Sequence, residues 1–441
     1  MPDPRFPSAF TWGAATSAYQ IEGAVAEDGR GASVWDTFCA TPGNVKDGAT
    51  GAVAVDHYHR YPEDLDLMAG LGLGGYRFSI AWPRIQPAGS GRPEQRGLDF
   101  YRRLVDGLRE RGIAPMATLF HWDLPQALQD AGGWENRDTA ERFAEYAEIM
   151  FDALDIRDWL TINEPKTVVD CGYRWGIHAP GVQDESRAFV VLHHLLLAHG
   201  LASRVLHEHH PGRRIGPALN LHPTYAAEDP DDPEVAKVVR HRDGLENRVY
   251  LDPIFKGAYP ADTLEWIAER SPMPSHIRDG DLKVIGEPVD VLGVQYYTSH
   301  FLDRRGERVL KYPTAQLEWL EIFPRGLYDL LVRLKDEYPA VPLLVTENGV
   351  PAPDEVGEDG RVDDQGRIAF LRDHLDAVGD ALAEGVPVEG YYVWSFLDNF
   401  EWAEGYEPRF GIVHVDYATQ RRTLKNSALW YRDLIATGRL G

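Results

Sequence analysis

Cysteine and positive charge are both scarce in this sequence. Its 441 residues include two cysteines, Cys39 and Cys171, for which we expect free thiols rather than a disulfide. Acidic residues outnumber basic ones by 69 to 45, so the net charge is -24 and the pI is about 5.0. The sequence shows no basic stripe, and we therefore expect no nucleic-acid partner and no attraction to an anionic membrane.

Segments that would carry the chain into a membrane or out of the cell are also missing. The start, residues 1–5, has neither the basic nor the apolar region of a signal peptide. The most apolar long stretch, residues 189–202, contains His193, His194 and His199 and is too short and too polar for a bilayer span. We expect a cytoplasmic protein without a membrane partner, either a monomer or a homo-oligomer.

Strand-like and helix-like segments alternate through most of the chain. Apolar residues follow a helical spacing at 97–111, 139–154, 326–338 and 368–382. Short apolar runs predict eight strands, at residues 10–16, 75–80, 113–120, 158–163, 215–221, 290–297, 343–347 and 388–394. Near-continuous apolar strands between amphipathic helices indicate parallel strands with helices outside.

Eight such units, undivided by a Pro/Gly/Ser linker, favour an α/β fold in which residues 1–441 form a single catalytic (β/α)8 barrel domain. Hydrophobic residues make up 44% of the chain, which is ample for the large core of such a barrel. An open, doubly wound sheet is the alternative, and the lack of a Gly-rich phosphate loop after the first strand disfavours it.

Two glutamates follow apolar strands, and each lies beside an asparagine. Glu164 comes after Asn163 at the end of one predicted strand, and Glu347 precedes Asn348 at the end of another. Because the carboxyl ends of barrel strands converge on one mouth, we expect these two carboxyl groups to meet there. Such a pair can divide acid–base work, since one group gives a proton while the other attacks or activates water.

The remaining strand ends are rich in side chains that suit a sugar. Amide, imidazole and carboxylate groups pair with hydroxyls, and aromatic rings cover the C–H faces of a pyranose. A single glutamate or histidine in such a place is more often structural, so the argument depends on convergence at one mouth. The candidates are Gln20, Arg77, His121, Trp122, Asn163, Tyr297, Trp394, Glu401 and Trp402.

Motifs for other catalytic chemistries are incomplete. The run from His207 to His210 lacks the i, i+4 histidine pair of a zincin helix, so we expect a solvated helix end there. Ser395 lies in no Gly-x-Ser-x-Gly elbow, which argues against a serine hydrolase. We therefore expect neither a metal nor a cofactor.

Taken in order, the motifs resemble family 1 of the glycoside hydrolases, whose typical members are β-glucosidases. Residues 161–165, TINEP, are similar to the family's acid–base motif, and residues 345–349, VTENG, to its nucleophile motif. The resemblance covers essentially the whole chain and is carried further by residues 10–23, 31–38, 76–80, 121–125, 394–406 and 409–411.

The resemblance implies a bacterial type of β-glucosidase, a retaining enzyme with a (β/α)8 fold. It would hydrolyse terminal non-reducing β-D-glucosyl residues by double displacement through a covalent glycosyl-enzyme. Small β-glucosides or cello-oligosaccharides would be its substrates, which implies a part in cellulose degradation. Activity on β-galactosides or β-fucosides stays open. The family resemblance implies no cofactor and no metal.

The resemblance also implies residue roles. Glu164 would be the general acid/base with a raised pKa, and Glu347 would be the ionised nucleophile beside Arg77. Retention would require the two carboxyl groups to lie about 5–5.5 Å apart. The sugar would be contacted by Gln20, His121, Trp122, Asn163, Tyr297, Trp394, Glu401, Trp402 and Phe410, with Arg77, Gln295 and Glu404 in support.

Two positions depart from the family pattern. Gln295 stands where most relatives have an asparagine, and its extra methylene should rearrange contacts near the sugar or the nucleophile. Relatives often place a tryptophan of the leaving-group site where this chain has Leu320, whereas Trp319 lies one position early. The leaving-group platform is therefore an open question at this point.

Two other functions compete with this interpretation. Relatives that cleave 6-phosphoglycosides carry a lysine and a tyrosine where this chain has Pro408 and Phe410, and the carboxylate of Glu401 would repel a phosphate. A 6-phospho-β-glycosidase is thus the weaker enzyme reading. A non-catalytic sugar-binding protein would be expected to lose Glu164 or Glu347, and a plant-type thioglucosidase would lack Glu164.

Overall fold

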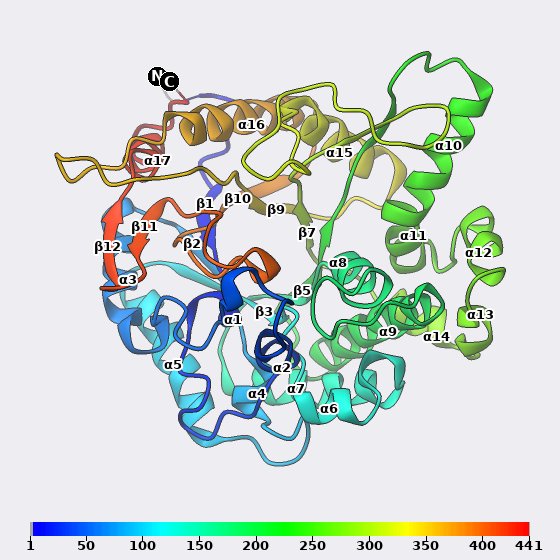
Figure 1. Ribbon diagram of the computed structural model, residues 1–441, viewed down its shortest axis with the longest axis horizontal. Coiled ribbons are helices and arrows are strands. Elements are labelled where there is room, and N and C mark those ends of the chain that lie inside the picture. The colour runs from blue at the N-terminus through cyan, green and yellow to red at the C-terminus, as the bar shows by residue number, and fades with distance from the viewer. Residues whose placement is uncertain (1–2, 441) are drawn as a thin grey trace.

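Eight parallel strands close into a barrel in the computed structural model, which describes residues 3–440 (Figure 1). Each predicted strand is present at its predicted place, so the barrel is confirmed and the doubly wound sheet is wrong. Around the barrel the order is β1 (Thr11–Ala15), β10 (Val388–Trp394), β9 (Leu343–Asn348), β7 (Leu292–Gln295), β5 (Arg214–Asn220), β4 (Asp158–Asn163), β3 (Ala114–Phe120) and β2 (Gly75–Ser79). Met1 and Pro2, in the predicted leaderless start, lie outside the described residues, as does Gly441.

The interior of the barrel is filled by side chains, and glycines make room for the largest of them. Tyr392 on β10 is buried between β1 and β2. A Cβ atom at Gly13 would lie 2.4 Å from its ring, and one at Gly75 would lie 2.7 Å from its hydroxyl. Contacts that short are not tolerated, so these strands need glycine where they pass the tyrosine. The packed interior leaves the strand ends at the mouth as the place for chemistry.

Helices surround the strands, as the amphipathic spacing predicts (Figure 1). The four predicted helices are α5 (Gln95–Glu110), α7 (Asp138–Ala153), α15 (Pro324–Glu337) and α16 (Gln365–Ala383). The other helices of at least seven residues are α2 (Val34–Ala40), α3 (His57–Leu71), α9 (Glu185–His209), α10 (Pro233–Asp243), α11 (Val249–Lys256), α12 (Ala261–Ala268), α17 (Asn426–Thr437) and the π-helix η3 (Val168–Arg174). Shorter ones are α1 (Ala18–Ile21), α4 (Trp82–Ile85), α6 (Gln126–Asp130), α8 (Pro165–Thr167), α13 (Met273–His276), α14 (Asp281–Ile285), η1 (Lys46–Gly48), η2 (Gly133–Glu135), η4 (Gly244–Arg248) and η5 (Trp402–Glu404).

The helix α9 is longer than the apolar stretch that the sequence shows. Its 25 residues are long and apolar enough to cross a membrane, with a mean hydropathy of 1.5 over 18 residues. However, 83% of that window is buried inside the fold, where α9 packs against α7, η3 and α14. The length of α9 is therefore sufficient for a membrane span, contrary to our expectation. Burial of this helix inside the protein nevertheless accounts for its apolar composition.

Two small sheets lie outside the barrel. β6 (Thr224–Ala226) pairs in parallel with β8 (His300–Leu302), and β11 (Val413–Asp416) pairs in antiparallel with β12 (Arg421–Leu424). The β6–β8 pair brings the segment after β5 next to the segment after β7. Both cysteines are free thiols, as expected.

Candidate active site

Glu347 lies near the carboxyl end of β9, where three donors converge on its buried carboxylate. Arg77, from β2, forms an ion pair with Oε1. Gln295, at the end of β7, donates to the same oxygen at 2.6 Å, and the hydroxyl of Tyr297 donates to Oε2 at 2.8 Å. A carboxylate that accepts a guanidinium and two further donors is stabilised in its ionised form.

Glu164 follows β4 directly and has different surroundings. Its backbone is left-handed, with φ of 44°, and Pro165 then begins α8. Such a conformation is unfavourable for a residue with a side chain and turns this carboxyl group out of the line of the strand. The residue is buried, and its Oε2 accepts a hydrogen bond from the hydroxyl of Thr167 at 2.6 Å.

Asn163 directly precedes Glu164 and shares two hydrogen-bond donors with Glu347. Its Oδ1 accepts from Arg77 and, at 2.6 Å, from Gln295, the same two residues that bind Glu347. Its Nδ2 lies 3.1 Å from Nε2 of His121, which leaves the second N–H of this amide for a ligand. Side chains of β2, β4, β7 and β9 therefore share one network. The separation expected for retention stays a prediction.

Burial and mutual repulsion set the charges of the pair. Burial, followed by the negative charge of Glu347, raises the pKa of Glu164 to about 8. Burial also raises the pKa of Glu347, whereas Arg77, Tyr297 and Gln295 act to lower it. Because three donors reach Glu347 and a single hydroxyl among the described residues reaches Glu164, the first proton leaves Glu347. The pair is thus prepared as one anion and one acid.

The aromatic candidates form a wall beside this network. The ring of His121 stacks between those of Trp394 and Trp402, at centroid distances of 5.8 and 6.0 Å. Trp122 packs on Trp402 at 4.6 Å and donates from Nε1 to the backbone oxygen of Asn163 at 3.0 Å. Trp122 and Trp402 both have positive φ, 78° and 52°, which is unfavourable for large residues and is often found at functional sites.

Gln20 and Glu401 meet on the same side. Nε2 of Gln20 donates to Oε2 of Glu401 at 3.4 Å and to the backbone oxygen of Phe400 at 2.9 Å. Burial, then the charges of Glu347, Glu164 and Glu404, raise the pKa of Glu401 to about 8. Glu404 itself is exposed, and it affects the site through the contribution of its negative charge to the raised pKa of Glu401.

Phe410 and Trp319 both pack on Tyr297. The ring of Phe410 is buried and meets Tyr297 edge-on at 6.2 Å, so it supports this tyrosine. Trp319 lies 6.0 Å from the same ring and is 44% exposed, whereas Leu320 is fully buried. Trp319, although one position early in the sequence, therefore supplies the exposed aromatic surface next to the nucleophile's tyrosine.

The sequence and the fold are both similar to those of known β-glucosidases. The family described as glycosyl hydrolase family 1 matches residues 3–439. The chain belongs to glycosyl hydrolase family 1. It is 46% identical to β-glucosidase A of Acetivibrio thermocellus over 98% of each chain, and 44% identical to a bifunctional β-D-glucosidase/β-D-fucosidase of Bifidobacterium breve over 98% of each. A solved β-glucosidase of Thermotoga maritima in complex with deoxynojirimycin superposes with a TM-score of 0.94, at 44% identity over 99% of each chain.

The histidines near the end of α9 pair with acidic side chains. His207 pairs with Asp290 at 2.9 Å, and His209 pairs with Glu148 at 2.8 Å. These contacts are with acidic side chains at the surface of the fold, in agreement with a solvated helix end.

Sequence reasoning missed two features next to Glu164. Thr167 offered a weak signal, because a hydroxyl three residues after the glutamate can fold back on it at a helix start. The second is a cluster of Lys166, His222, Glu246 and His300, which comes from four separate segments and had no local signal.

Proposed function

We propose that this family 1 enzyme hydrolyses terminal non-reducing β-D-glucosyl residues of small β-glucosides and cello-oligosaccharides, with retention of configuration. The observation that carries the proposal is that the two buried carboxyl groups have different hydrogen-bond and charge surroundings. Glu347 receives a guanidinium and two other donors, whereas Glu164 has a pKa raised to about 8. At neutral pH the site therefore holds a nucleophile and an acid together.

In the first step, Glu347 attacks the anomeric carbon while Glu164 gives its proton to the leaving oxygen. The glycosidic bond breaks, a covalent bond to Glu347 forms, and the aglycone departs as a neutral alcohol. The free N–H of Asn163 is available to the sugar 2-hydroxyl, a contact that strengthens as the ring gains oxocarbenium character.

In the second step, the roles of the two residues change. Esterified Glu347 carries no charge, so the repulsion that raises the pKa of Glu164 disappears and Glu164 becomes a competent base. It takes a proton from water, the water oxygen attacks the anomeric carbon, and the carboxylate of Glu347 leaves. Two inversions in sequence give net retention.

Sugar recognition in the proposal uses the aromatic wall and the polar pair. The ring face of the sugar would cover Trp394, and its hydroxyls would bind Gln20, His121, Glu401 and Trp402. Because the pKa of Glu401 is raised to about 8, its carboxyl group can both donate and accept with sugar hydroxyls. These groups suit several epimers, so glucosides are proposed as the main substrates and β-fucosides or β-galactosides as secondary ones.

The setting of the activity is part of the same proposal. Two free thiols support a reducing compartment, which we take to be the cytoplasm. A net charge of -24 disfavours nucleic acid or anionic lipid as a partner. Cello-oligosaccharides in that compartment would be late products of cellulose breakdown.

The test is hydrolysis of an aryl β-D-glucoside followed by proton NMR from the first minute. We expect the β-anomer of glucose to appear first and to mutarotate afterwards. First appearance of the α-anomer would contradict retention. Cleavage of the corresponding 6-phosphoglucoside in preference to the glucoside would favour the 6-phospho-β-glycosidase instead.

A further inference from the structure

Lys166 places a buried ammonium group two residues after the acid/base residue. It belongs to α8, and 8% of the residue is exposed. Its Nζ donates to Nδ1 of His222 at 2.9 Å. A lysine is seldom buried without a partner, because its charge loses the stabilisation that water provides. An acceptor and a counter-charge are therefore to be expected around it.

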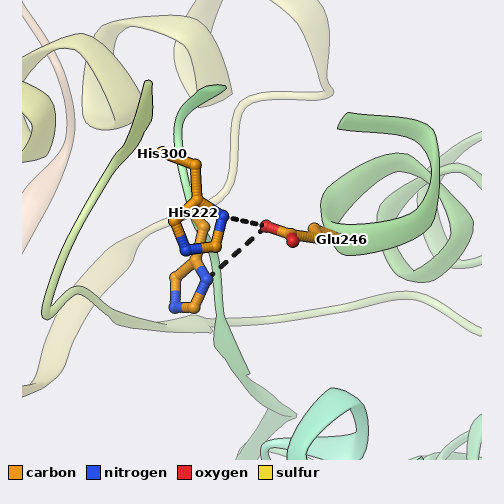
Figure 2. A group of neighbouring side chains, drawn as sticks. All are labelled: His222, Glu246 and His300. Carbon is orange, nitrogen blue, oxygen red and sulfur yellow. Dashed lines mark ion pairs between the residues drawn. The ribbon is translucent and has the colours of Figure 1, made fainter. Parts of the chain in front are cut away.

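Glu246, on η4, provides the counter-charge. Its Oε2 lies 2.9 Å from Nδ1 of His300 and 3.6 Å from Nδ1 of His222 (Figure 2). Burial raises the pKa of Glu246, but the charge of Lys166 and contacts with the two histidines lower it well below its ordinary value. The carboxylate is thus ionised, and it approaches the same Nδ1 of His222 that accepts the hydrogen bond from Lys166.

The same three side chains could in principle hold a metal ion. Their ligand atoms, from His222, Glu246 and His300, all lie within 4.8 Å of one another. However, the nitrogen of His222 that faces Glu246 already accepts a hydrogen bond from Lys166. A metal ion bound to that nitrogen would have to displace an ammonium group and then stand beside it. The ammonium group of Lys166 already supplies the positive charge in this cluster.

Lys166 lies two positions after Glu164, which is the N-cap residue of the same short helix. Burial and Glu347 raise the pKa of Glu164, whereas Thr167, Lys166 and Arg77 lower it. Arg77 is already engaged by Glu347 and Asn163, which leaves Lys166 as the cation not committed to the nucleophile. The other titratable groups are Asp170 and Cys171 around Lys166, and Tyr297 and Glu401 around Glu164.

We propose that Lys166 is a positioning residue whose charge stabilises the ionised form of Glu164, while His222 and Glu246 hold its ammonium group in place. The inference rests on the proposed function, because it concerns the second step. There Glu164 must carry a negative charge so that it can accept the proton of water. Lys166 supplies a nearby positive charge at that moment and does not touch the sugar.

The experiment measures the alkaline limb of kcat/KM against pH, which follows the ionisation of Glu164 in the free enzyme. Lys166→Met removes a positive charge, so the limb should move to higher pH by about half a unit or more. Glu246→Gln removes a negative charge from the same surroundings, so the limb should move to lower pH. An effect of charge alone should shift the alkaline limbs of the two variants in opposite directions, whereas a loosened structure would shift both limbs in the same direction.

Two controls accompany these variants. Lys166→Arg retains the cation, so its limb should stay within the error of the parent. Lys237→Met removes a positive charge from α10, where the side chain is 72% exposed, and should not move the limb. Melting temperatures establish that each variant is folded. If Lys166→Met does not fold, Lys166→Gln, which also removes the charge, takes its place and should move the limb in the same direction.

A second readout separates the two chemical steps. With an activated aryl glucoside we expect an initial burst of phenol, which identifies hydrolysis of the glycosyl-enzyme as the slow step; Lys166→Met should then lower kcat severalfold while the burst remains. Unmoved or parallel limbs, or a limb that moves on dialysis against a chelator, would overturn the inference. If the enzyme is a retaining glucosidase but the pH limbs do not move, the proposed function stands and only the role of Lys166 is rejected. If the chain is inactive on all glycosides, both the proposed function and the role of Lys166 are rejected.

Discussion

Gln295 donates a hydrogen bond to Oε1 of Glu347 at 2.6 Å, the same oxygen that receives Arg77. Its Nε2 also reaches Oδ1 of Asn163 at 2.6 Å, so one amide group binds both strand-end partners. The additional methylene, relative to the asparagine of most relatives, is therefore used for reach. The sequence marked this position as a departure, and the structure shows what the departure does.

Gln295→Asn tests that reach. The shorter amide should lose contact with one partner, which raises the pKa of Glu347 because a donor to the ionised form is gone. The acidic limb of kcat/KM should move to higher pH, and kcat/KM should fall by about tenfold, as expected for loss of one hydrogen bond to a charged group. Gln95→Asn, on the exposed side of α5, is the matched control and should change neither.

Glu347→Gly tests the nucleophile. Hydrolysis should fall by on the order of 10⁴-fold, since the covalent step has no attacking group. Azide can enter the vacated space and attack from the same face, and the product should be the α-glucosyl azide. Product analysis by NMR is the measurement, and a β-configured azide would assign the nucleophile elsewhere.

Glu164→Gln tests the acid through the leaving group. Glucosides of weakly acidic alcohols need protonation of the departing oxygen, whereas those of acidic phenols do not. A plot of log kcat/KM against leaving-group pKa should therefore become much steeper in the variant. A parallel displacement of the whole plot would show that Glu164 is not the proton donor.

The same variant should change how stability depends on pH. A carboxyl group whose folded pKa is raised to about 8 binds its proton more tightly in the native state, so stability falls as pH rises from the unfolded value toward 8. Glutamine does not titrate, so the variant should gain on the parent by at most about 1.4 kcal/mol per pH unit in this window. Urea unfolding at pH 5, 6.5 and 8 measures the gap, which should be smallest at pH 5.

Trp319→Ala tests the exposed aromatic surface beside Tyr297. A sugar in the leaving-group position would lose a stacking partner, so kcat/KM for cellobiose should fall about fivefold to tenfold. The value for an activated aryl glucoside, whose reaction depends less on binding there, should fall less. The ratio between the two substrates is an internal control, and an unchanged ratio would place the leaving group elsewhere.

The strands and most of the site could be predicted because their signals are local. A buried parallel strand is a continuous apolar run, and a residue just after such a run, like Glu347, must lie at the mouth of a barrel. The contacts of Gln295 and the arrangement around Lys166 could not be predicted. They depend on how far side chains reach across strands. They also depend on the β6–β8 pair, which brings the segment that contains His222 next to His300.

Helix α9 shows the converse error. Residues 189–202 are apolar, but the helix continues through polar residues at both ends, which packing and capping accommodate. Asp184 accepts from the backbone N–H groups of Ser186 and Arg187 and so fixes the start of the helix. This helix was not among those predicted from the sequence, and its length depends on packing partners that only the fold supplies.

Tyr392, wedged past Gly13 and Gly75, has a consequence for the order of events during turnover. A barrel interior packed in this way is a core and not a pore, so we expect substrate, water and products to share the mouth. The departing alcohol and the water that replaces it would then use the same opening. An alcohol that enters by that opening would compete with water for the glycosyl-enzyme, so we expect the glucosyl group to be transferred to alcohols as well as to water.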